Sequence, residues 1–347
     1  MVSAVLQTSF LGDMILTTPL LERLAERGRV VVVATPANAA LLTNHRAVSD
    51  VIVFDKRGVD RGVGGVRRVA ERLRASGATT AYIAQGSLRT AALARLAGIR
   101  ERVGFATSPG RVLYTTRVPF RRELHHAQRL WQLGSAVSDA EAPVVRPTLY
   151  PRDEDCATVD ALLAANGVEI GEPLIAFAPG SVWATKRWPS FDGLAAALAS
   201  DSLLRSHRVV VIGAAGDALL ANAIGAALQT AGAAPVIDAT GRLSLLASAA
   251  LLSRASALVT NDSAPLHLAS AMNTPTVALF GPTVPAFGFG PLAEKSGVVQ
   301  QESLSCRPCD AHGPQTCPLS HWKCMRDTTA EIVSARLRQT LAPDREK

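Results

Sequence analysis

Polar residues cluster in the stretch NDSAPLHLASAMNTPTVALFGPT, residues 261–283, where a helical pattern of small residues leads into an apolar strand. Asp262 and Ser263 stand just before Pro265, a residue favoured in a first helical turn because it has no N–H to leave unpaired. Either side chain can cap this helix by accepting hydrogen bonds from its first N–H groups. The same helix start carries a partial positive charge, so it can also hold a phosphate or a sugar hydroxyl. The stretch alone leaves both interpretations open.

The elements that must position these residues form a repeated pattern of short apolar runs alternating with helical stretches rich in alanine and leucine. The strand-like runs are SAVLQTS, VVVVATP, DVIVFD, TAYIAQGS and ERVGF in the first half, then PLIAFAPGS, RVVVIGAAGD, PVIDATG, ALVTND and TPTVALFGPT. Strands separated by helices imply parallel pairing through right-handed crossovers. We therefore predict an α/β fold with two Rossmann-like domains, residues 1–160 and 161–347, the second ending in an amphipathic helix.

The loops of such a fold indicate where a ligand binds, because open α/β sheets hold ligands beyond the carboxyl ends of their strands. In the first half, the loop TSFLGDMILTTP places Gly12 and Asp13 at a helix entry, where an aspartate is by itself an ordinary cap. In the second half the loops are PGSVWATKRWP, GAAGD, ATGRLSL, NDSAPLH and FGPT. Small, polar and glycine-bearing loops suit a nucleotide held between two domains. A dehydrogenase is less well supported, because the first strand is not followed by Gly-x-Gly-x-x-Gly.

Composition limits the classes of protein and partner. The chain has 347 residues, a net charge of +7 and 48% hydrophobic residues, enough for two buried cores. The positive charge favours anionic partners such as nucleotides, phosphorylated glycolipids or membrane surfaces. The arginines are scattered and lack interleaved aromatic residues, so nucleic-acid binding is not expected. No apolar run approaches the ~20 residues that span a bilayer, and a secretory signal pattern is lacking, so we expect a cytoplasmic protein.

Four segments, taken in order, resemble the motifs of glycosyltransferase family 9, the lipopolysaccharide heptosyltransferases, and most closely the heptosyltransferase II branch. They are SFLGDMILTTPLLERL, APGSVWATKRWP, NDSAPLHLASAMNTPTVALFGPT and CRPCDAHGPQTCPLSHWKCM. The resemblance implies a GT-B fold, in which domain 1–160 binds the acceptor and domain 161–347 binds ADP-L-glycero-D-manno-heptose across a cleft. It also implies inverting transfer, without a required metal cofactor, to a Kdo-containing lipid A or lipopolysaccharide inner-core acceptor. Such an enzyme contacts the cytoplasmic face of the inner membrane peripherally, which fits the basic first half.

The resemblance also assigns catalytic residues. Asp13 matches the family's catalytic aspartate, and Lys186 matches the lysine placed against the donor phosphates. A base for the acceptor hydroxyl and a group that stabilises the leaving diphosphate are what inverting transfer requires. The ordinary alternatives are a helix cap for Asp13 and a surface lysine for Lys186. Gly12 is assigned to the acceptor side, and His125 and Arg129 in LHHAQR resemble an acceptor-facing region, although structural neighbours on one helical face show the same spacing.

The other donor-site residues are likewise implied by the resemblance. Asp262 would contact the donor sugar or ribose, and the backbone N–H groups of Ser263 and Ala264 would bind the diphosphate. On this interpretation, the helix start and the ligand site are one structure. The remaining positions are Ser181 and Val182 along the phosphates, Asp217 at the ribose, Leu243 along the adenine, His267 in the first helical turn and Thr283 closing the site.

The cysteines form a separate pattern. Cys306, Cys309, Cys317 and Cys324 lie in one segment of a chain that has only five cysteines. A Cys-x-x-Cys pair followed by two further cysteines has the spacing of metal ligands, and a reducing cytoplasm disfavours disulfides. The segment is poor in apolar residues, so a tetrahedral zinc would supply stability that burial cannot. The sequence allows either a structural zinc or four reduced thiols in a surface loop, and it predicts no catalytic metal.

Two other classes of function stay open. A nucleotide-sugar epimerase can also use two Rossmann-like domains, a carboxylate and a nucleotide cradle, and it would isomerise the donor sugar without an acceptor. A non-catalytic nucleotide-binding module would bind ADP without turnover, although the presence of both Asp13 and Lys186 argues against it. The sequence does not determine the acceptor linkage, the heptose isomer or the oligomeric state.

Overall fold

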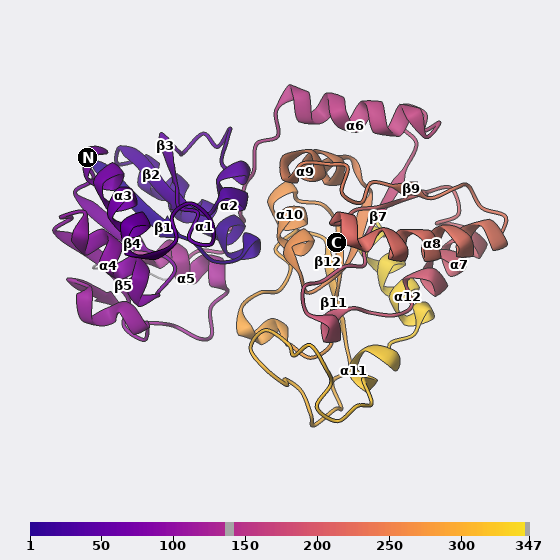
Figure 1. Cartoon of the computed structure of the whole chain (residues 1–347). Helices are drawn as coiled ribbons and strands as arrows, with labels where there is room; N and C mark the ends of the chain where they lie inside the picture. The colour runs from indigo at the N-terminus through magenta and orange to yellow at the C-terminus, as the bar shows by residue number, and fades with distance from the viewer. Residues whose placement is uncertain (136–141, 344–347) are drawn as a thin grey trace. The chain divides into compact units, whose positions relative to one another are not determined.

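The structure is a computed structural model that describes residues 1–135 and 142–343. The chain divides into two compact units, Met1–Tyr150 and Pro151–Lys347, each built around one parallel sheet (Figure 1). The predicted α/β class is confirmed, because helices connect the parallel strands throughout both units. Within the described part of the chain, no helix combines the length and the apolar character needed to cross a membrane.

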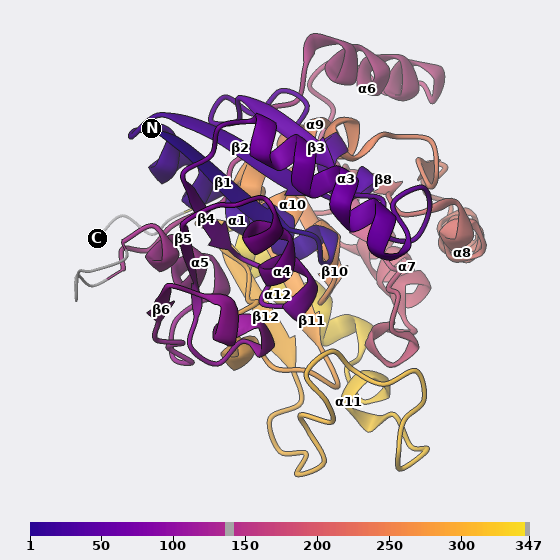
Figure 2. The ribbon, with the colours of Figure 1, turned by 60° about the vertical axis from the view of Figure 1, so that its left-hand side comes forward.

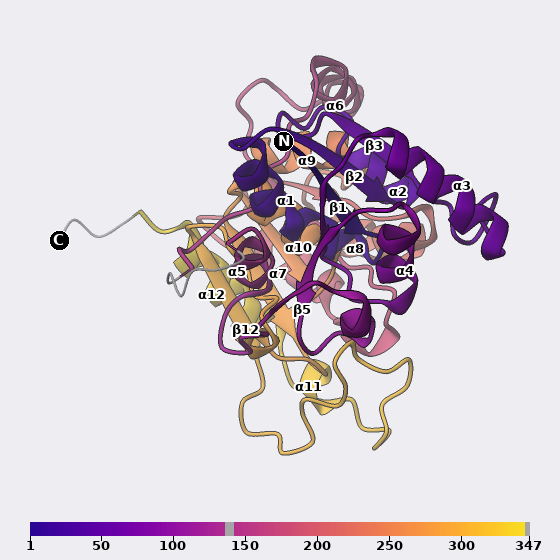
Figure 3. The same cartoon turned by 90° about the vertical axis from the view of Figure 1, so that its left-hand side faces the viewer.

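The first unit contains a six-stranded sheet in the order β3-β2-β1-β4-β5-β6. The strands are β1 (Val2–Gln7), β2 (Arg29–Ala34), β3 (Asp50–Val53), β4 (Thr80–Ile83), β5 (Glu101–Phe105) and β6 (Thr116–Val118). The helices are α1 (Leu11–Ala25), α2 (Pro36–Leu41), α3 (Gly62–Ala75), α4 (Leu88–Leu96), η1 (Pro109–Leu113) and α5 (His126–Leu133). Figure 3 shows α3 and α4 on one face of the sheet, and α1 and α5 on the other. Because both faces are covered, the central strands β1 and β2 are buried along their whole length except at the first residue, and most of their residues are apolar.

The second unit contains a six-stranded sheet in the order β12-β11-β10-β7-β8-β9. The strands are β7 (Leu174–Ala178), β8 (Arg208–Val211), β9 (Ile237–Asp238), β10 (Ala257–Asn261), β11 (Thr276–Phe280) and β12 (Ser296–Gln300). The helices are α6 (Asp153–Ala165), η2 (Ala184–Lys186), α7 (Phe191–Ser200), η3 (Ala215–Asp217), α8 (Ala218–Thr230), α9 (Leu245–Arg254), α10 (Ala264–Met272), η4 (Pro285–Phe287), α11 (Lys323–Arg326) and α12 (Ala330–Leu341). Helices α7, α8 and α12 pack together on one face of this sheet, and α9 and α10 on the other. Figure 2 shows the segment between β12 and α11 as a long loop without helix or strand.

The units divide at Tyr150, earlier than the boundary predicted at residue 160. The difference is due to α6, which the prediction placed mostly before the boundary but which packs against α9 in the second unit. Asp155 of α6 accepts a hydrogen bond from Ser244 Oγ at 3.0 Å, and Asp160 forms an ion pair with Arg254. These polar contacts at the surface of α6 give no periodic apolar signal that could have assigned the helix to the second unit.

Every predicted strand segment contains a strand, but β6 and β12 were not predicted. β6 has the sequence TRV, and β12 has the sequence SGVVQ. Both strands lie at the edge of a sheet, where polar and small residues interrupt the apolar run that marks a central strand. The prediction therefore found the middle of each sheet and missed one edge of each.

The strand order reverses between β1 and β4 in the first unit, and between β7 and β10 in the second. Doubly wound sheets bind ligands at such a reversal, outside the carboxyl ends of the strands. The loop after β1 leads to Asp13, the loop after β7 leads to Lys186, and the loop after β10 begins with Asp262. The fold thus places three of the predicted residues where the topology favours a ligand.

Candidate functional site

Asp13 is the third residue of α1, and the predicted Gly12 is the second. The N-cap position belongs to Phe10, which makes no side-chain hydrogen bond to the helix, so Asp13 is not the cap. Ser9 Oγ instead lies 2.5 Å from Asp13 Oδ2. The Asp13 side chain is 19% exposed, which leaves its carboxylate accessible. The helix-cap alternative for this residue is therefore not supported.

Ser9 connects Asp13 to a second acceptor, the side chain of Gln7. Ser9 Oγ lies 2.7 Å from Gln7 Oε1, and the backbone N–H of Ser9 donates to the same oxygen at 3.3 Å. Gln7 Nε2 donates to Thr17 Oγ1 at 3.1 Å, which fixes the amide so that its oxygen faces Ser9. A hydroxyl has one proton to donate, so Ser9 donates either to Asp13 or to Gln7 at any moment.

His126, the first residue of α5, lies beside the same carboxylate. Its Nε2 atom is 3.7 Å from Asp13 Oδ1, which is longer than a hydrogen bond. Burial, together with the nearby charge of Arg129, lowers the pKa of His126 to about 3, so the ring is neutral at neutral pH. The sequence prediction had selected the neighbouring His125.

His125 and Arg129 support the chain around the start of α5. His125 precedes the helix as its N-cap, and its Nδ1 atom accepts a backbone N–H of the first turn at 3.2 Å. The buried Arg129 donates to the carbonyls of Arg121, at 2.8 Å, and of Arg122, and its guanidinium lies over the Phe120 ring. His125 and Arg129 lie one helical turn apart, because the backbone N–H of Arg129 donates to the carbonyl of His125 at 3.0 Å. Acceptor binding by these two residues stays a prediction.

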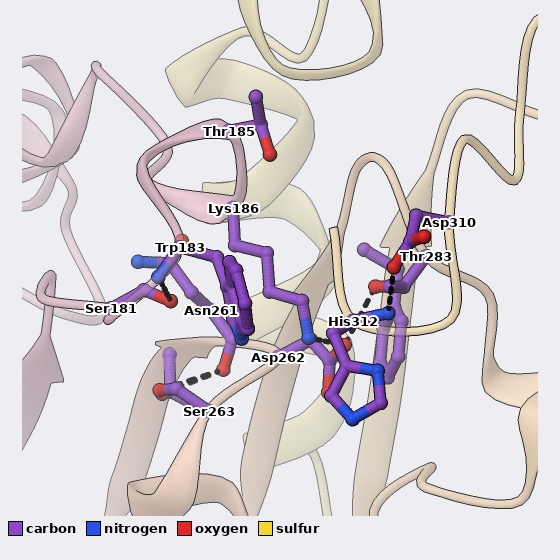
Figure 4. A network of polar contacts seen from close by, with 12 residues as sticks. Ser181, Trp183, Thr185, Lys186, Asn261, Asp262, Ser263, Thr283, Asp310 and His312 are labelled. Carbon is purple, nitrogen blue, oxygen red and sulfur yellow. Dashed lines mark hydrogen bonds and ion pairs between the residues drawn. The ribbon is translucent and has the colours of Figure 1, made fainter. Parts of the chain in front are cut away.

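Lys186, Asp262 and Thr283 meet at the carboxyl edge of the second sheet (Figure 4). Lys186 Nζ and Thr283 Oγ1 each lie 2.6 Å from the same oxygen, Asp262 Oδ2. Lys186 and Asp262 are each 8% exposed, and Thr283 is 2% exposed. The surface-lysine alternative for Lys186 is therefore wrong. An ammonium has three N–H donors, so an anionic ligand can be bound in addition to Asp262.

Helix α10 begins at Ala264 with Pro265 in its first turn, as predicted. The capping interpretation is wrong, because Asp262 binds Lys186 and the N-cap residue Ser263 makes no side-chain hydrogen bond to the helix. Ser263 Oγ lies 3.4 Å from the carbonyl of Asn261 instead. A helix start without a side-chain cap keeps the N–H groups and positive potential that attract a phosphate.

Two further predicted donor residues lie on the loop after β7, and a third lies in α10. Ser181 Oγ accepts the backbone N–H of Trp183 at 3.2 Å, and Val182 is 73% exposed. His267 is buried in α10, with its ring centroid 6.2 Å from that of Phe289. The roles of these side chains toward a donor stay predictions.

Asp217 closes a turn of its own after β8. Its Oδ2 atom accepts the backbone N–H of Ala214 at 2.9 Å. Its carboxylate also lies against Gly180 and Gly213, where an added Cβ would come within 2.3 and 2.6 Å of Asp217 Oδ2. The two glycines are thus needed for Asp217 to reach the edge of the sheet. Leu243 is half-buried just before α9, and contacts of either residue with a nucleotide stay predictions.

Comparisons with known proteins decide the family. The sequence profile described as glycosyltransferase family 9 (heptosyltransferase) matches residues 66–322, well over half of the chain. The chain belongs to glycosyltransferase family 9. It is similar to lipopolysaccharide heptosyltransferase 2 of Salmonella typhimurium, with 28% identity over 308 residues, 85% of this chain and 87% of the relative.

Solved structures agree with this family 9 assignment. The structure described as E. coli ADP-heptose lps heptosyltransferase II matches with a TM-score of 0.77 and 25% identity, covering 98% of each chain. The family 9 glycosyltransferase from Veillonella parvula matches with a TM-score of 0.85 and 23% identity, covering 98% of this chain and 97% of the other. The predicted GT-B fold class is confirmed. So is the expectation of a glycosyltransferase that transfers a heptosyl group.

The cysteine segment of this family 9 enzyme does not form a metal-ligand set. Within the described residues, no three His, Cys, Asp or Glu side chains lie together as a group that could hold a metal ion. Cys306 Sγ is 3.9 Å from His321 Nε2, Cys309 Sγ donates to the carbonyl of Cys306 at 3.3 Å, and the thiols are free. The arrangement does not fit a tetrahedral zinc as it stands, and the predicted structural zinc stays a prediction.

Two thiols of this segment should react with iodoacetamide at different rates. Burial acts to raise the pKa of Cys317, but hydrogen bonds from backbone N–H groups of residues 319–322 outweigh it and lower the pKa overall. Burial, with the charges of neighbouring thiols, raises the pKa of Cys324 to about 11. Because the thiolate is the nucleophile, Cys317 should be alkylated first and Cys324 last at mildly alkaline pH. Peptide mass spectrometry measures the order, and equal protection of both thiols that a chelator removes would contradict the free-thiol structure.

Proposed function

We propose that this enzyme transfers heptose from ADP-L-glycero-D-manno-heptose to the inner core of lipopolysaccharide and inverts the anomeric centre. The observation that carries the proposal is the buried pair of Lys186 and Asp262 at the strand-order reversal, in a chain of the heptosyltransferase family. The names of the similar Salmonella and E. coli proteins, which specify lipopolysaccharide and ADP-heptose, support this choice of acceptor and donor.

In the second unit, Lys186 supplies the positive charge that the reaction needs. Breaking the bond between the anomeric carbon and the diphosphate oxygen leaves negative charge on ADP, which an ammonium held in a buried site stabilises. Asp262 fixes the ammonium through a bond of 2.6 Å, and Thr283 donates to the same carboxylate oxygen. The start of α10, at Ser263 and Ala264, provides further attraction for the diphosphate. With this charge in place, the transfer needs no divalent metal.

In the first unit, Asp13 serves as the general base. It takes the proton of the acceptor hydroxyl while that oxygen attacks the anomeric carbon from the face opposite the leaving diphosphate, which inverts the centre. Ser9 suits both states of the base: it donates to charged Asp13 and, once Asp13 holds the proton, turns its own proton to Gln7 and accepts from Asp13. The Ser9 hydroxyl thus offers a hydrogen-bond partner before and after the proton transfer.

Ser9→Ala should lower turnover by about tenfold, less than the roughly 10²–10⁴ expected for loss of the general base itself, because Ser9 only holds that base. The variant removes a donor that favours the charged carboxylate, so the acid limb of the pH dependence of kcat should move to higher pH. Steady-state rates across a pH series measure both effects. Ser253→Ala is a matched control, because Ser253 Oγ donates to the Ala250 carbonyl within α9. An unchanged profile in Ser9→Ala would contradict a role of Ser9 in the proton transfer.

The first unit also suits an anionic glycolipid at a membrane surface. Arg57, Arg61 and Arg67 are exposed around the start of α3, together with Val59 and Val63, which are 79% and 77% exposed. Exposed apolar side chains among arginines fit a phosphorylated, Kdo-containing lipid A in a bilayer of anionic lipids. We therefore propose peripheral contact with the cytoplasmic face of the inner membrane.

A donor panel tests the proposal. With a Kdo-containing or monoheptosylated lipid A acceptor, ADP-heptose should support ADP release, and UDP-glucose should be a much poorer donor. Robust transfer from a UDP-sugar and none from ADP-heptose would contradict the proposal. Isomerisation of the donor sugar without an acceptor would indicate an epimerase, and ADP binding without turnover would indicate a binding module.

A further inference from the structure

The long loop between β12 and α11, residues 301–322, has no part in the chemistry proposed above. Its middle, residues 312–315, lies against the loop that carries Lys186, and we call these four residues the supporting segment. The ring centroid of His312 is 6.0 Å from that of Trp183, on the loop after β7.

Gln315 binds the backbone of the Lys186 loop at two points. Its Nε2 atom donates to the carbonyl of Val182 at 3.1 Å, and its Oε1 atom accepts the backbone N–H of Ala184, also at 3.1 Å. Thr185 Oγ1 donates to the carbonyl of Pro314 next to it. The supporting segment therefore fixes the loop at residues 182–185, directly before Lys186.

Gly313 confines the side chain of Lys186 itself. Its φ angle is +84°, and an added Cβ would lie 3.3 Å from both Cγ and Cε of Lys186 and 3.1 Å from Pro282 Cγ. The peptide backbone at position 313 thus packs directly on the lysine stem. A free lysine side chain samples many rotamers. Because this contact already restricts the rotamers of Lys186, less conformational entropy is lost when the ammonium binds a ligand.

The same loop also holds residues 281–283, which include Thr283, the second side chain that donates to Asp262. The guanidinium of Arg307 donates to the carbonyls of Gly281 and Thr283 at 2.7 and 2.8 Å. The backbone N–H of Cys309 donates to the carbonyl of Pro282 at 2.8 Å. Both side chains that bind Asp262 are thus positioned by contacts from residues 307–315.

We propose that residues 307–315 of this loop are part of the donor site and that Gln315 is a positioning residue, which sets the place of the Lys186 ammonium through residues 182–185. The inference rests on the proposed donor role of Lys186. Without the two hydrogen bonds of Gln315, the loop after β7 loses its fixed backbone, and the ammonium meets the donor diphosphate less often in the productive place.

Gln315→Met keeps the side-chain length and removes both hydrogen bonds. We expect kcat/KM for ADP-heptose to fall by about tenfold or more and ADP to bind more weakly in calorimetry. Gln315 is exposed, so the melting temperature should not change. Gln301→Met is the matched control, because Gln301 lies on the same loop but its side chain donates to Asp327 and Thr328; its donor kinetics should stay at the wild-type level.

Combining the substitution with Lys186→Met separates this inference from the function on which it rests. If Gln315 acts through Lys186, adding Gln315→Met to Lys186→Met should change kcat/KM by less than about twofold. A full, additive loss in that background would overturn the positioning role. Wild-type kinetics in Gln315→Met, with Lys186→Met impaired, would overturn this inference alone, and wild-type kinetics in Lys186→Met would overturn the donor role of Lys186.

Discussion

Asp13→Asn should lower kcat by roughly 10²–10⁴, the usual scale for loss of a general base, while the affinity for ADP stays unchanged. Asparagine keeps the shape of the side chain and can still accept a hydrogen bond from Ser9, but it cannot take the proton of the acceptor hydroxyl. The melting temperature should change little, because Asp13 does not cap α1. Single-turnover assays with saturating ADP-heptose, together with ADP calorimetry, measure the two quantities.

Asp155→Asn is the matched control, since Asp155 occupies the same third position in α6 that Asp13 occupies in α1. Its carboxylate accepts the backbone N–H of Arg152 at 3.0 Å and the Ser244 hydroxyl at 3.0 Å, so its role is structural. That variant should lose some stability and keep its turnover. The opposite result, a stability loss and normal turnover in Asp13→Asn, would return Asp13 to a purely structural role.

Lys186→Met should lower kcat/KM for ADP-heptose by roughly 10²–10³, the scale observed when one preorganised donor to a developing negative charge is removed. It should also destabilise the second unit by about 3–5 kcal/mol, because it leaves the buried Asp262 carboxylate without its cation. Thr283 still donates to that carboxylate, which places the expected loss toward the lower end. Donor kinetics and thermal melting measure the two effects separately.

The double variant Lys186→Met with Asp262→Asn distinguishes catalysis from folding. Removing the buried charge along with its partner should restore most of the melting temperature, because a neutral amide no longer needs a cation. Turnover should stay low, because the ammonium is still absent. Recovery of activity together with stability would mean that Lys186 only supports the fold.

The fold could be predicted because its signal is local. Central strands such as RVVVVA and LIAFA are covered on both faces, so runs of consecutive apolar residues indicate them in the sequence. The edge strands β6 and β12 lack this signal, and the placement of α6 depends on its packing against α9. These features depend on contacts between residues that are distant in the sequence, and the local sequence does not record them.

The site could be predicted only where a motif marked it. Asp13 and Lys186 were found through the resemblance, and the structure removes the ordinary alternative for each. His126 was missed in favour of His125, because a shift of one residue in the start of α5 decides which ring reaches Asp13. Gln315 was missed because its bond to Val182 spans 133 positions of the sequence, and no local pattern records such a contact.

The identity of the product tests the central claim most directly. Purified enzyme is incubated with ADP-L-glycero-D-manno-heptose and a series of truncated inner-core acceptors, and the products are analysed by mass spectrometry and by NMR of the new anomeric centre. The proposed function predicts a product one heptose heavier than its acceptor, with the anomeric configuration opposite to that of the donor, formed in the presence of a chelator. A product with retained configuration, or an isomerised free sugar with no gain in acceptor mass, would contradict it.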